Sequence, residues 1–249
     1  MRPDGRRPGE VRTIRITPDF VPSALSSVLI ETGRTRVICT ISREPKVPSW
    51  LVSGGWLTAE YAMLPGATTP RGRRDPGGRG REIQRLIGRS LRASLDLSRL
   101  VGPTGALALI CDCDVIEADG GTRTAAITGA SVALDLALAR LRRQGELEHD
   151  PRRGSVAAVS VGLMAVQEPD DPRPVVDLCY AEDHCASVDL NVVMLRADAN
   201  SSLVELQGAA ERDTFTRHQL NAMLDLAEPA IDELLARQRE AVAQGSTRD

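Results

Sequence analysis

The stretch from 107 to 141 constrains the fold of this 249-residue chain more than any other segment. It starts with an apolar run that ends at Ile116, and an Asp119-Gly120-Gly121 turn follows. From about Thr124 the sequence is rich in Ala, Leu and Val. A short apolar run before a glycine turn is typical of a buried strand, and an Ala- and Leu-rich segment is typical of a helix. The sequence therefore predicts a strand, a glycine turn and a helix, in that order.

The turn has the composition of an anion-binding loop. Gly120 and Gly121 allow backbone N–H groups to face a ligand, and Thr122 can cap the helix or donate its hydroxyl. Arg123 adds a positive charge at the helix N-terminus. A lone Asp-Gly-Gly-Thr turn is also common as ordinary punctuation, so both interpretations stay open. The chain has neither GxxxxGK[ST] nor GxGxxG, which argues against a P-loop and a dinucleotide fingerprint.

The five cysteines form an odd set without a CxxC pair, which fits neither a disulfide framework nor a zinc ribbon. Strand alternation places Cys111 and Cys113 on one face of their strand, with Asp112 and Asp114 on the other. We therefore expect reduced, mostly buried thiols with no chemical role.

The rest of the chain alternates between strand-like and helical patterns. The expected elements are strands within 12–62, a helix over 82–98, the helix over 124–142, a strand over 155–166, two strands between 175 and 195, and a helix over 216–243 interrupted at Pro229. Strands precede a helix and then resume before a final long helix. The order predicts a mixed α/β (α+β) fold over 1–249, with an N-terminal half over 1–150 and a C-terminal half over 151–249.

Arginine is unevenly distributed along the chain. Of 31 basic residues only Lys46 is not arginine, and the formal net charge is −3. Eight arginines and two acids lie between Arg71 and Arg92, first in a Gly- and Pro-rich loop over 65–80 and then on a helix. The helix is expected to bury Ile83, Leu86, Ile87, Leu91 and Leu95 and to present Arg81, Arg85, Arg89 and Arg92 on the opposite face. Either this is a solvated helix face or it contacts a polyanion, since guanidinium groups suit phosphate.

Two carboxylates are the strongest acidic candidates. Asp183 precedes a predicted strand on which Asp189 and Asn191 share a face. A folded hairpin would bring the two carboxylates together as general acid and metal ligands, although either aspartate alone is as easily a turn former. The three histidines, His149, His184 and His218, have no HxxxH or triad context and are expected to be ordinary surface or core residues.

Several function classes lose support from composition. Only six aromatic residues are present, so RRM and OB modules with base-stacking platforms are disfavoured. No run of 18 apolar residues and no signal-peptide pattern appear, which predicts a cytoplasmic protein without a membrane partner.

Taken together, the motifs resemble the ribonuclease PH family from end to end. The matching segments are MRPDGR at Met1, GWLTAEYAMLP at Gly55, REIQRLIGRSLRA at Arg81, CDCDVIEADGGTRTAAITGA at Cys111, DLNVVM at Asp189 and the segment that starts at Gln207. This resemblance implies two βαβ-like halves of the type seen in ribosomal protein S5 domain 2. It also implies a homohexamer built as a trimer of dimers.

The resemblance further implies an enzyme, a nucleotidyltransferase that trims 3′ ends of transfer RNA precursors and other RNAs by phosphorolysis. Its implied site residues are Arg79, Gly121, Thr122 and Arg123 for inorganic phosphate, with Arg123 also catalytic; Asp183 and Asp189 as catalytic carboxylates and ligands of Mg²⁺; and Arg71, Arg73 and Arg74 for RNA. Three positions depart from the family pattern: Gly66 replaces an arginine, Ala209 a threonine and Ser26 a glycine. The alternatives are a noncatalytic RNA-binding ring subunit and a hydrolytic two-metal nuclease.

Overall fold

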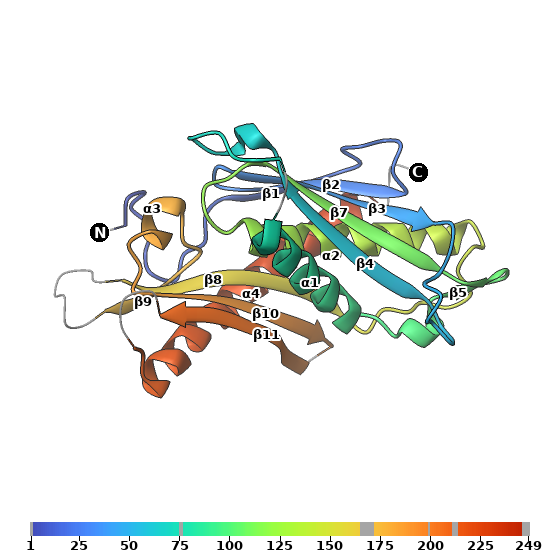
Figure 1. The fold of residues 1–249 in the computed structure, drawn as a ribbon. Coiled ribbons are helices and arrows are strands. Elements are labelled where there is room, and N and C mark those ends of the chain that lie inside the picture. The colour runs from blue at the N-terminus through green and yellow to red at the C-terminus, as the bar shows by residue number, and fades with distance from the viewer. Residues whose placement is uncertain (1, 75–76, 165–171, 199, 211–213, 246–249) are drawn as a thin grey trace.

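A computed structural model describes residues 2–74, 77–164, 172–198, 200–210 and 214–245, which form two large sheets, a small two-stranded one and four α-helices (Figure 1). The first sheet has the order β1-β2-β3-β7-β4, with β1 (Ile14–Pro18), β2 (Ser26–Thr32), β3 (Thr35–Glu44), β4 (Trp56–Met63) and β7 (Ala108–Glu117). The second has the order β11-β10-β8-β9, with β8 (Ser155–Met164), β9 (Arg173–Val176), β10 (Val188–Ala197) and β11 (Asn200–Ala210). The predicted mixed α/β fold is confirmed.

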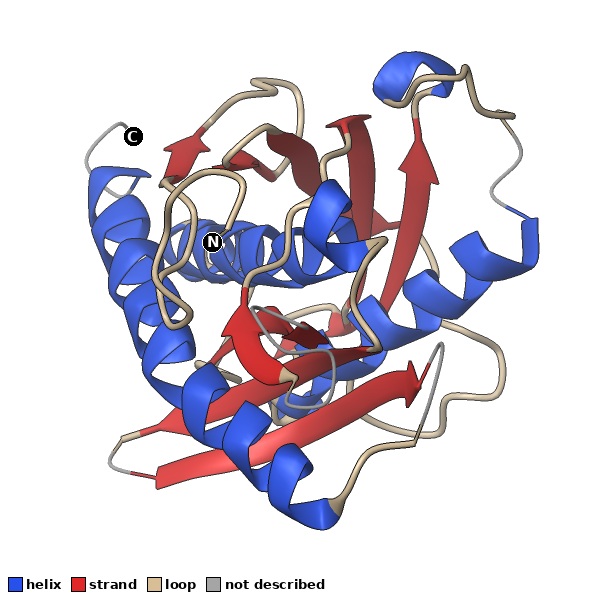
Figure 2. Cartoon of the chain, turned by 90° about the vertical axis from the view of Figure 1, so that its left-hand side faces the viewer, coloured by secondary structure: helices blue, strands red, loops and turns tan. Residues whose placement is uncertain are grey.

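The remaining elements connect or cover these sheets. They are the helices α1 (Gly77–Ala93), α2 (Thr122–Arg143), α3 (Tyr180–Asp183) and α4 (Arg217–Gly245), the 3₁₀ turns η1 (Pro65–Ala67) and η2 (Leu97–Arg99), and the hairpin of β5 (Val101–Gly102) with β6 (Gly105–Ala106). Helix α2 contacts β2 and β3 of one sheet and β8 of the other, while α1 packs on β4 and α4 on β8 (Figure 2). The halves therefore share α2 as their common core.

Helix α2 is apolar around almost its whole circumference because both sheets contact it. By length and hydropathy it passes a test for a membrane-crossing helix, and 83% of its most apolar window is buried inside the protein. A helix that is hydrophobic all round is typical of a protein core as well as of a membrane span. Gly129 lies at its closest approach to the sheet, where a Cβ would come within 2.7 Å of Ile30.

Helix α1 starts earlier than the apolar periodicity indicates. The first helical residue is Gly77 rather than Glu82, and the helix ends at Ala93 rather than at position 98. Because the glycines at 77, 78 and 80 have no side chain, this first turn shows no apolar periodicity, and the sequence pattern does not indicate a helix there. The predicted core face is confirmed, since all five of its apolar residues are buried.

The C-terminal half departs from two predictions. The segment before Asp189 is not a hairpin with β10: β9 and β10 both pair with β8, on its opposite edges, and the short helix α3 fills the connection. Helix α4 is continuous through Pro229 rather than interrupted there. Burial of its apolar face against β8, β9 and α2 compensates for the backbone hydrogen bond that proline cannot make. Of the strand predicted over 155–166, residues 165 and 166 lie outside the described residues.

Three of the five thiols form the expected buried group. The Sγ atom of Cys113 lies 3.8 Å from those of both Cys39 and Cys111, inside the first sheet. Cys179 is partly buried and Cys185 is exposed, and all five are free. The hydrogen bond with Cys113, together with burial, raises the pKa of Cys111 well above its usual range, so this thiol stays protonated.

Candidate active site

The two halves meet around one polar cavity. A wide part of about 600 Å³ and a narrower adjoining part of about 200 Å³ share five lining residues: Arg79, Arg123, Asp183, Asp189 and Asn191. Two of these come from helix N-termini of the N-terminal half, and three from α3 and β10 of the C-terminal half. The fold therefore joins the predicted phosphate-binding arginines and the predicted carboxylates at a single cavity.

The loop between β7 and α2 forms the floor of the narrow part. Gly120 (φ +76°) and Gly121 (φ +66°) both adopt the left-handed conformation that favours glycine. A Cβ on Gly120 would lie only 2.6 Å from the carbonyl oxygen of Leu178, so glycine is also required by packing. Gly121 is the N-cap of α2 and Thr122 its first helical residue, so Thr122 does not cap the helix. The helix N-terminus thus opens towards the cavity with no side-chain cap.

The Thr122 hydroxyl is held by a tyrosine that pattern reasoning does not single out. Tyr61 Oη donates a hydrogen bond to Thr122 Oγ1 at 2.9 Å, from strand β4. Burial raises the pKa of Tyr61, which therefore stays a neutral donor at physiological pH. Because the Thr122 oxygen accepts this hydrogen bond, its own O–H group is left to donate to a ligand.

Arg123 is oriented by the second half of the chain. Its Nη1 atom donates to Gln207 Oε1 of β11 at 2.8 Å, and Gln207 in turn donates through Nε2 to Glu82 of α1. Gln207 and Glu82 both line the wide part of the cavity. The guanidinium keeps four further N–H donors, enough to bind an anion while this contact is retained.

Strand register explains the carboxylate side of the cavity. Asp189 pairs with Ala209 and Asn191 with Gln207 in the β10–β11 ladder, and directly opposed residues project to the same face. The expectation that Asp189 and Asn191 share a face is confirmed, since both line the cavity. Only the register of β11 shows that Gln207 joins them, and no sequence pattern indicated that strand.

Asp183 reaches the same cavity from the last residue of α3. His184 lines it as well, and its ring stacks on that of Tyr180 with centroids 6.2 Å apart and planes 19° from parallel. The expectation that His184 is an ordinary surface residue is incomplete, because the residue is exposed but borders the candidate site. Its neighbours in sequence gave no signal, since only the α3 turn brings it to the cavity.

The other arginines of the basic segment have different positions. Arg71, Arg73 and Arg74 are exposed on the connection between η1 and α1 and do not line the cavity. The predicted arginine face of α1 is exposed at Arg81, Arg85 and Arg89 and only partly exposed at Arg92. Two of these arginines contact other parts of the chain. Arg89 forms a two-pronged pair with Glu205 of β11, at 2.6 and 2.7 Å, and Arg92 lies 4.7 Å from the Trp56 ring centroid, where it also donates to the Leu57 carbonyl.

The donor set of the cavity fits a hard divalent cation. Asp183, Asp189 and Asn191 offer carboxylate and amide oxygens, which are the ligands that Mg²⁺ prefers. Within the described part of the chain no group of three His, Cys, Asp or Glu side chains gathers around a point. Such a site suits Mg²⁺, which is commonly bound through one or two carboxylates together with substrate phosphates.

An unblocked helix N-terminus, two arginines and two carboxylates at one cavity define an enzyme of phosphate chemistry on a mixed α/β fold. Residues 10–139 match the 3′ exoribonuclease family, domain 1, and residues 154–230 match domain 2 of that family. The chain belongs to the 3′ exoribonuclease family.

Named relatives and solved structures agree with this assignment. The chain is 51% identical to proteins named ribonuclease PH from Acaryochloris marina, covering 98% of both chains, and from Corynebacterium efficiens, covering 97% and 96%. The fold resembles rice Rrp46 (TM-score 0.75, 16% identity, 97% of this chain and 100% of that one). It also resembles a chain of the Archaeoglobus fulgidus exosome with RNA bound to the active site (TM-score 0.78, 23% identity, 95% and 92%).

Proposed function

We propose that this chain is a phosphorolytic 3′-to-5′ exoribonuclease that trims transfer RNA precursors and other RNA 3′ ends. The observation that carries the proposal is the junction of Arg79, Thr122 and Arg123 with Asp183 and Asp189 at one cavity. Near 50% identity to proteins named ribonuclease PH over nearly the whole chain supports it.

Inorganic phosphate is the attacking group in this reaction. Arg79, Arg123, the Thr122 hydroxyl and the Gly121 N–H hold it as charge-assisted and neutral hydrogen-bond donors. A phosphate oxygen forms a bond to the phosphorus of the terminal nucleotide in line with the departing 3′ oxygen. The products are a nucleoside diphosphate and an RNA one nucleotide shorter. Because a phosphodiester is exchanged for an anhydride of similar free energy, the same site adds nucleotides from nucleoside diphosphates in reverse.

The carboxylates act on the leaving side. Asp183 and Asp189 would hold Mg²⁺, which when bound would supply charge stabilisation for the phosphoryl oxygens. The two carboxylates also assist transfer of a proton to the departing 3′ oxygen. Asn191 beside them adds an amide for the same oxygens. Catalysis is therefore mainly positioning and electrostatics, with no covalent intermediate on the protein.

RNA approaches from the exposed arginines Arg71, Arg73 and Arg74, which contact the phosphate backbone without reading sequence. Gly66 offers no charge where the family has an arginine, and Arg73 supplies one nearby. We further propose a cytoplasmic homohexamer, built as a trimer of dimers, as the working assembly.

The two alternatives predict different chemistry. A noncatalytic ring subunit has no need of both carboxylates and both phosphate-binding arginines at one cavity. A hydrolytic two-metal nuclease requires a richer carboxylate cluster, whereas Asp183 and Asp189 share this cavity with two arginines.

Trimming of a 3′-extended transfer RNA with Mg²⁺, with and without inorganic phosphate, tests the proposal. We expect nucleoside diphosphates as products, formed only when phosphate is present, and RNA extension when a nucleoside diphosphate replaces phosphate. Arg123→Ala should abolish both directions, whereas Arg237→Ala, a matched change at an exposed arginine of α4, should preserve them. Nucleoside monophosphates formed without added phosphate would reject phosphorolysis in favour of hydrolysis.

A further inference from the structure

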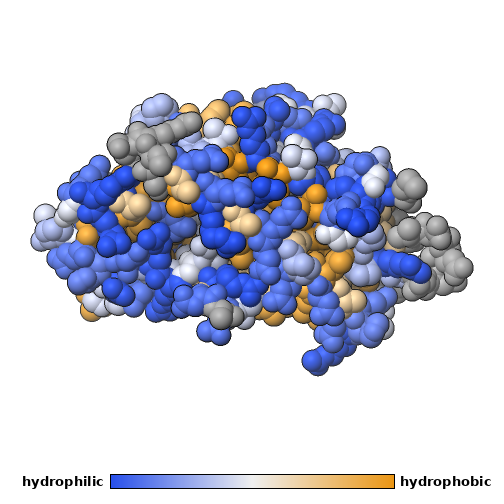
Figure 3. Space-filling model, turned by 180° about the vertical axis from the view of Figure 1, so that it is seen from behind, coloured by the Kyte–Doolittle hydropathy of each residue, from blue (hydrophilic) through white to orange (hydrophobic). Residues whose placement is uncertain are grey.

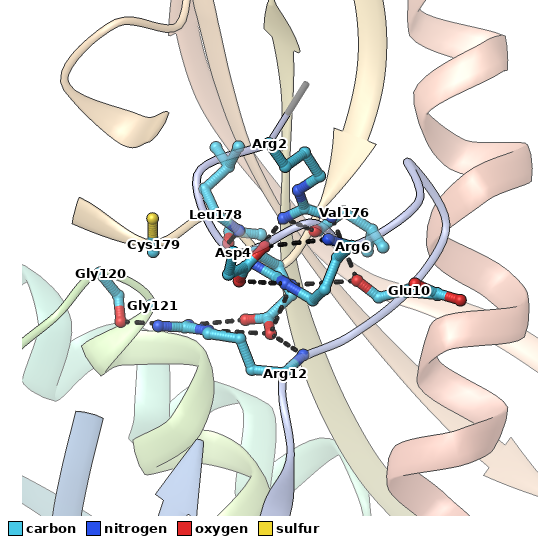
Figure 4. Close-up of polar contacts among 12 residues, drawn as sticks. Arg2, Asp4, Arg6, Glu10, Arg12, Gly120, Gly121, Val176, Leu178 and Cys179 are labelled. Atoms are coloured by element: carbon cyan, nitrogen blue, oxygen red, sulfur yellow. Dashed lines mark hydrogen bonds and ion pairs between the residues drawn. The ribbon is translucent and has the colours of Figure 1, made fainter. Parts of the chain in front are cut away.

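A buried ion cluster lies behind the candidate active site, and the proposed chemistry makes no use of it. The N-terminal segment 2–12 supplies its cations, and the segment after β9 supplies its anions (Figure 4). Its five members are Arg2, Arg6, Arg12, Asp177 and Glu182, of which Arg2, Arg12, Asp177 and Glu182 are less than 9% exposed. Burying so many charges requires mutual compensation, and such clusters are weak evidence for stability as such.

Arg12 and Asp177 form the centre of the cluster. Arg12 donates from Nε to Asp177 Oδ2 at 3.0 Å and from Nη2 to Oδ1 at 2.7 Å, and its backbone N–H donates to Oδ2 at 2.7 Å. Burial alone would lower the pKa of Arg12, but hydrogen bonding to Asp177 and attraction to the charges of Asp177 and Asp119 together outweigh burial and raise the pKa. Arg12 is therefore a fixed, permanently charged donor.

The outer nitrogens of Arg12 extend beyond this ion pair to the phosphate loop. Nη1 donates to the Asp119 carbonyl oxygen at 2.6 Å, and Nη2 donates to that of Gly120 at 3.4 Å. Thr35 acts on the same two residues, since its hydroxyl donates to the Gly120 carbonyl oxygen at 2.6 Å and accepts from the Asp119 N–H at 2.9 Å. Figure 4 shows Arg12 reaching from the N-terminal segment to Gly120.

These contacts fix the direction of two peptide N–H groups. In a trans peptide the N–H points opposite to the carbonyl oxygen of the same unit. The units whose oxygens face Arg12 carry the N–H groups of Gly120 and Gly121, so these point away from Arg12. Neither donates a hydrogen bond within the described part of the chain, and both glycines line the narrow part of the cavity. Two donors are thereby left for an anion.

The other two arginines of the cluster, Arg2 and Arg6, bind the turn that leads to Asp183 on the carboxylate side of the cavity. Arg2 donates to both carboxylate oxygens of Glu182 at 2.6 and 2.9 Å, and Arg6 reaches the same group at 3.3 Å. The Glu182 carboxylate also accepts from the Cys179 N–H, which closes the turn of α3 that ends at Asp183.

We propose that Arg2, Arg6 and Arg12 are positioning residues for the phosphate site, with Arg12 setting the N–H groups of the loop for inorganic phosphate. The inference rests on the proposed phosphorolytic function and adds to it residues that touch no substrate. One segment thus ties the phosphate loop of the N-terminal half to the Asp183 turn of the C-terminal half.

Arg12→Lys is the informative substitution, because lysine keeps the charge beside Asp177 but loses the planar fork that reaches both carbonyls. We expect the KM for phosphate to rise about tenfold, with the KM for RNA changed less than about twofold, as fits the loss of charge-assisted hydrogen bonds. Without RNA, added inorganic phosphate should raise the melting temperature of the variant much less than that of the wild type.

Arg140→Lys is the matched control. Arg140 likewise joins a carboxylate and a carbonyl, those of Asp19 at 2.5 Å and Leu25 at 3.0 Å, away from the cavity. This variant should keep the wild-type KM for phosphate. Equal phosphate KM values in Arg12→Lys and Arg140→Lys would overturn the proposal and leave the cluster a purely structural feature.

Thr35→Val provides the same test without altering a buried charge, should Arg12→Lys fail to fold. It removes the hydroxyl that holds Asp119 and Gly120 and should again raise the phosphate KM selectively. An unchanged phosphate KM in folded Thr35→Val would contradict the proposal. If wild-type protein trims RNA without phosphate, the proposed function fails instead, and that result is independent of either variant.

Discussion

At the scale of single residues, Asp135 is the carboxylate whose ionisation conflicts most with its surroundings. It lies within α2, and burial raises its pKa to about 6, opposed by Arg152, whose nearest nitrogen is 3.8 Å away. Arg152 is engaged mainly by Asp150, at 2.5 Å. Ionisation of buried Asp135 therefore destabilises the folded protein, because attraction to Arg152 offsets only part of the cost of burying the charge.

The sign of the pH dependence follows from this raised pKa. Between about pH 4 and pH 6 the folded protein binds a proton that the unfolded chain has released, so the contribution of Asp135 to the free energy of unfolding falls as pH rises. Asp135→Asn should thus be more stable than the wild type by about 1–3 kcal/mol at pH 8, and the gain should shrink towards pH 4. Urea unfolding at both pH values measures it.

Asp150→Asn is the control of opposite sign, because the hydrogen bonds from Arg152 lower the pKa of Asp150 despite partial burial. That variant should lose stability at pH 8. A loss of stability in Asp135→Asn at pH 8 would show that its pairing with Arg152 outweighs the burial of its charge.

At the scale of elements, local sequence patterns predicted those segments in which apolar side chains mark the buried face. The apolar rows of α1 and α2 and the alternation of β7 and β10 were predicted correctly because burial imposes a period on them. The first turn of α1 contains glycines and therefore no period. Strand β11 is largely exposed on both faces, so it carries no alternation. The predicted hairpin was wrong because pairing partners are set by the whole sheet, and here β8 separates β9 from β10.

The candidate site, like the fold, was predicted only in part. Arg79, Arg123, Asp183 and Asp189 were identified, and the structure places them at one cavity. The residues that hold them in place were not. Gln207, Tyr61 and Arg12 each act through a contact across at least 61 positions of sequence. Such contacts leave no local spacing to detect, so their roles become visible only in the folded chain.

The connection between η1 and α1 carries a prediction of its own. Arg71, Arg73 and Arg74 are exposed and lie outside the cavity, so replacing all three by alanine should weaken RNA binding while leaving the KM for phosphate unchanged. The slope of log affinity against log salt should decrease by about 2 for single-stranded RNA, as expected for three released counterions.

A triple variant of equal charge loss separates this local effect from a change in net charge. Arg142, Arg153 and Arg237 are 48–60% exposed. Arg142 lies at the C-terminal end of α2, Arg153 pairs with Asp96 beyond the C-terminal end of α1, and Arg237 lies on α4. Their replacement by alanine should leave the salt slope near that of the wild type. The same decrease in both triple variants would mean that the connection has no special part in RNA binding.

At the scale of the whole molecule, the site depends on assembly of the two halves. The N-terminal half contributes the phosphate loop and Arg79, the C-terminal half contributes Asp183 and Asp189, and segment 2–12 bridges both. One hydrophobic cluster joins the first sheet and α2 to Val156, Ala158 and Val193 of the second sheet, and another lies between the second sheet and α4. Helix α2 is buried between the two sheets. Separation of the halves would therefore dismantle the cavity even if each kept its sheet.

The outer surface gives the physical reason to expect further assembly. Large apolar side chains remain exposed, including Trp50 at 60%, Val52 at 98% and Leu203 at 50%. Strand β11, which carries Leu203, is an edge of its sheet, and Figure 3 shows apolar side chains scattered over the rear of a mostly hydrophilic surface. Exposed apolar groups and open strand edges are common places for subunit contacts.

Association into a closed symmetric oligomer buries such apolar groups and strand edges without forming an open-ended filament. For the proposed homohexamer we expect light scattering at micromolar concentration to give a mass six times that of the 26.8 kDa chain. A symmetric trimer of dimers contains two kinds of interface, so dilution should yield a discrete smaller species, a dimer or a trimer, before the monomer. A monomer mass at micromolar concentration would contradict the assembly, and the trimming assay with and without phosphate would still test the function proposed for the cavity.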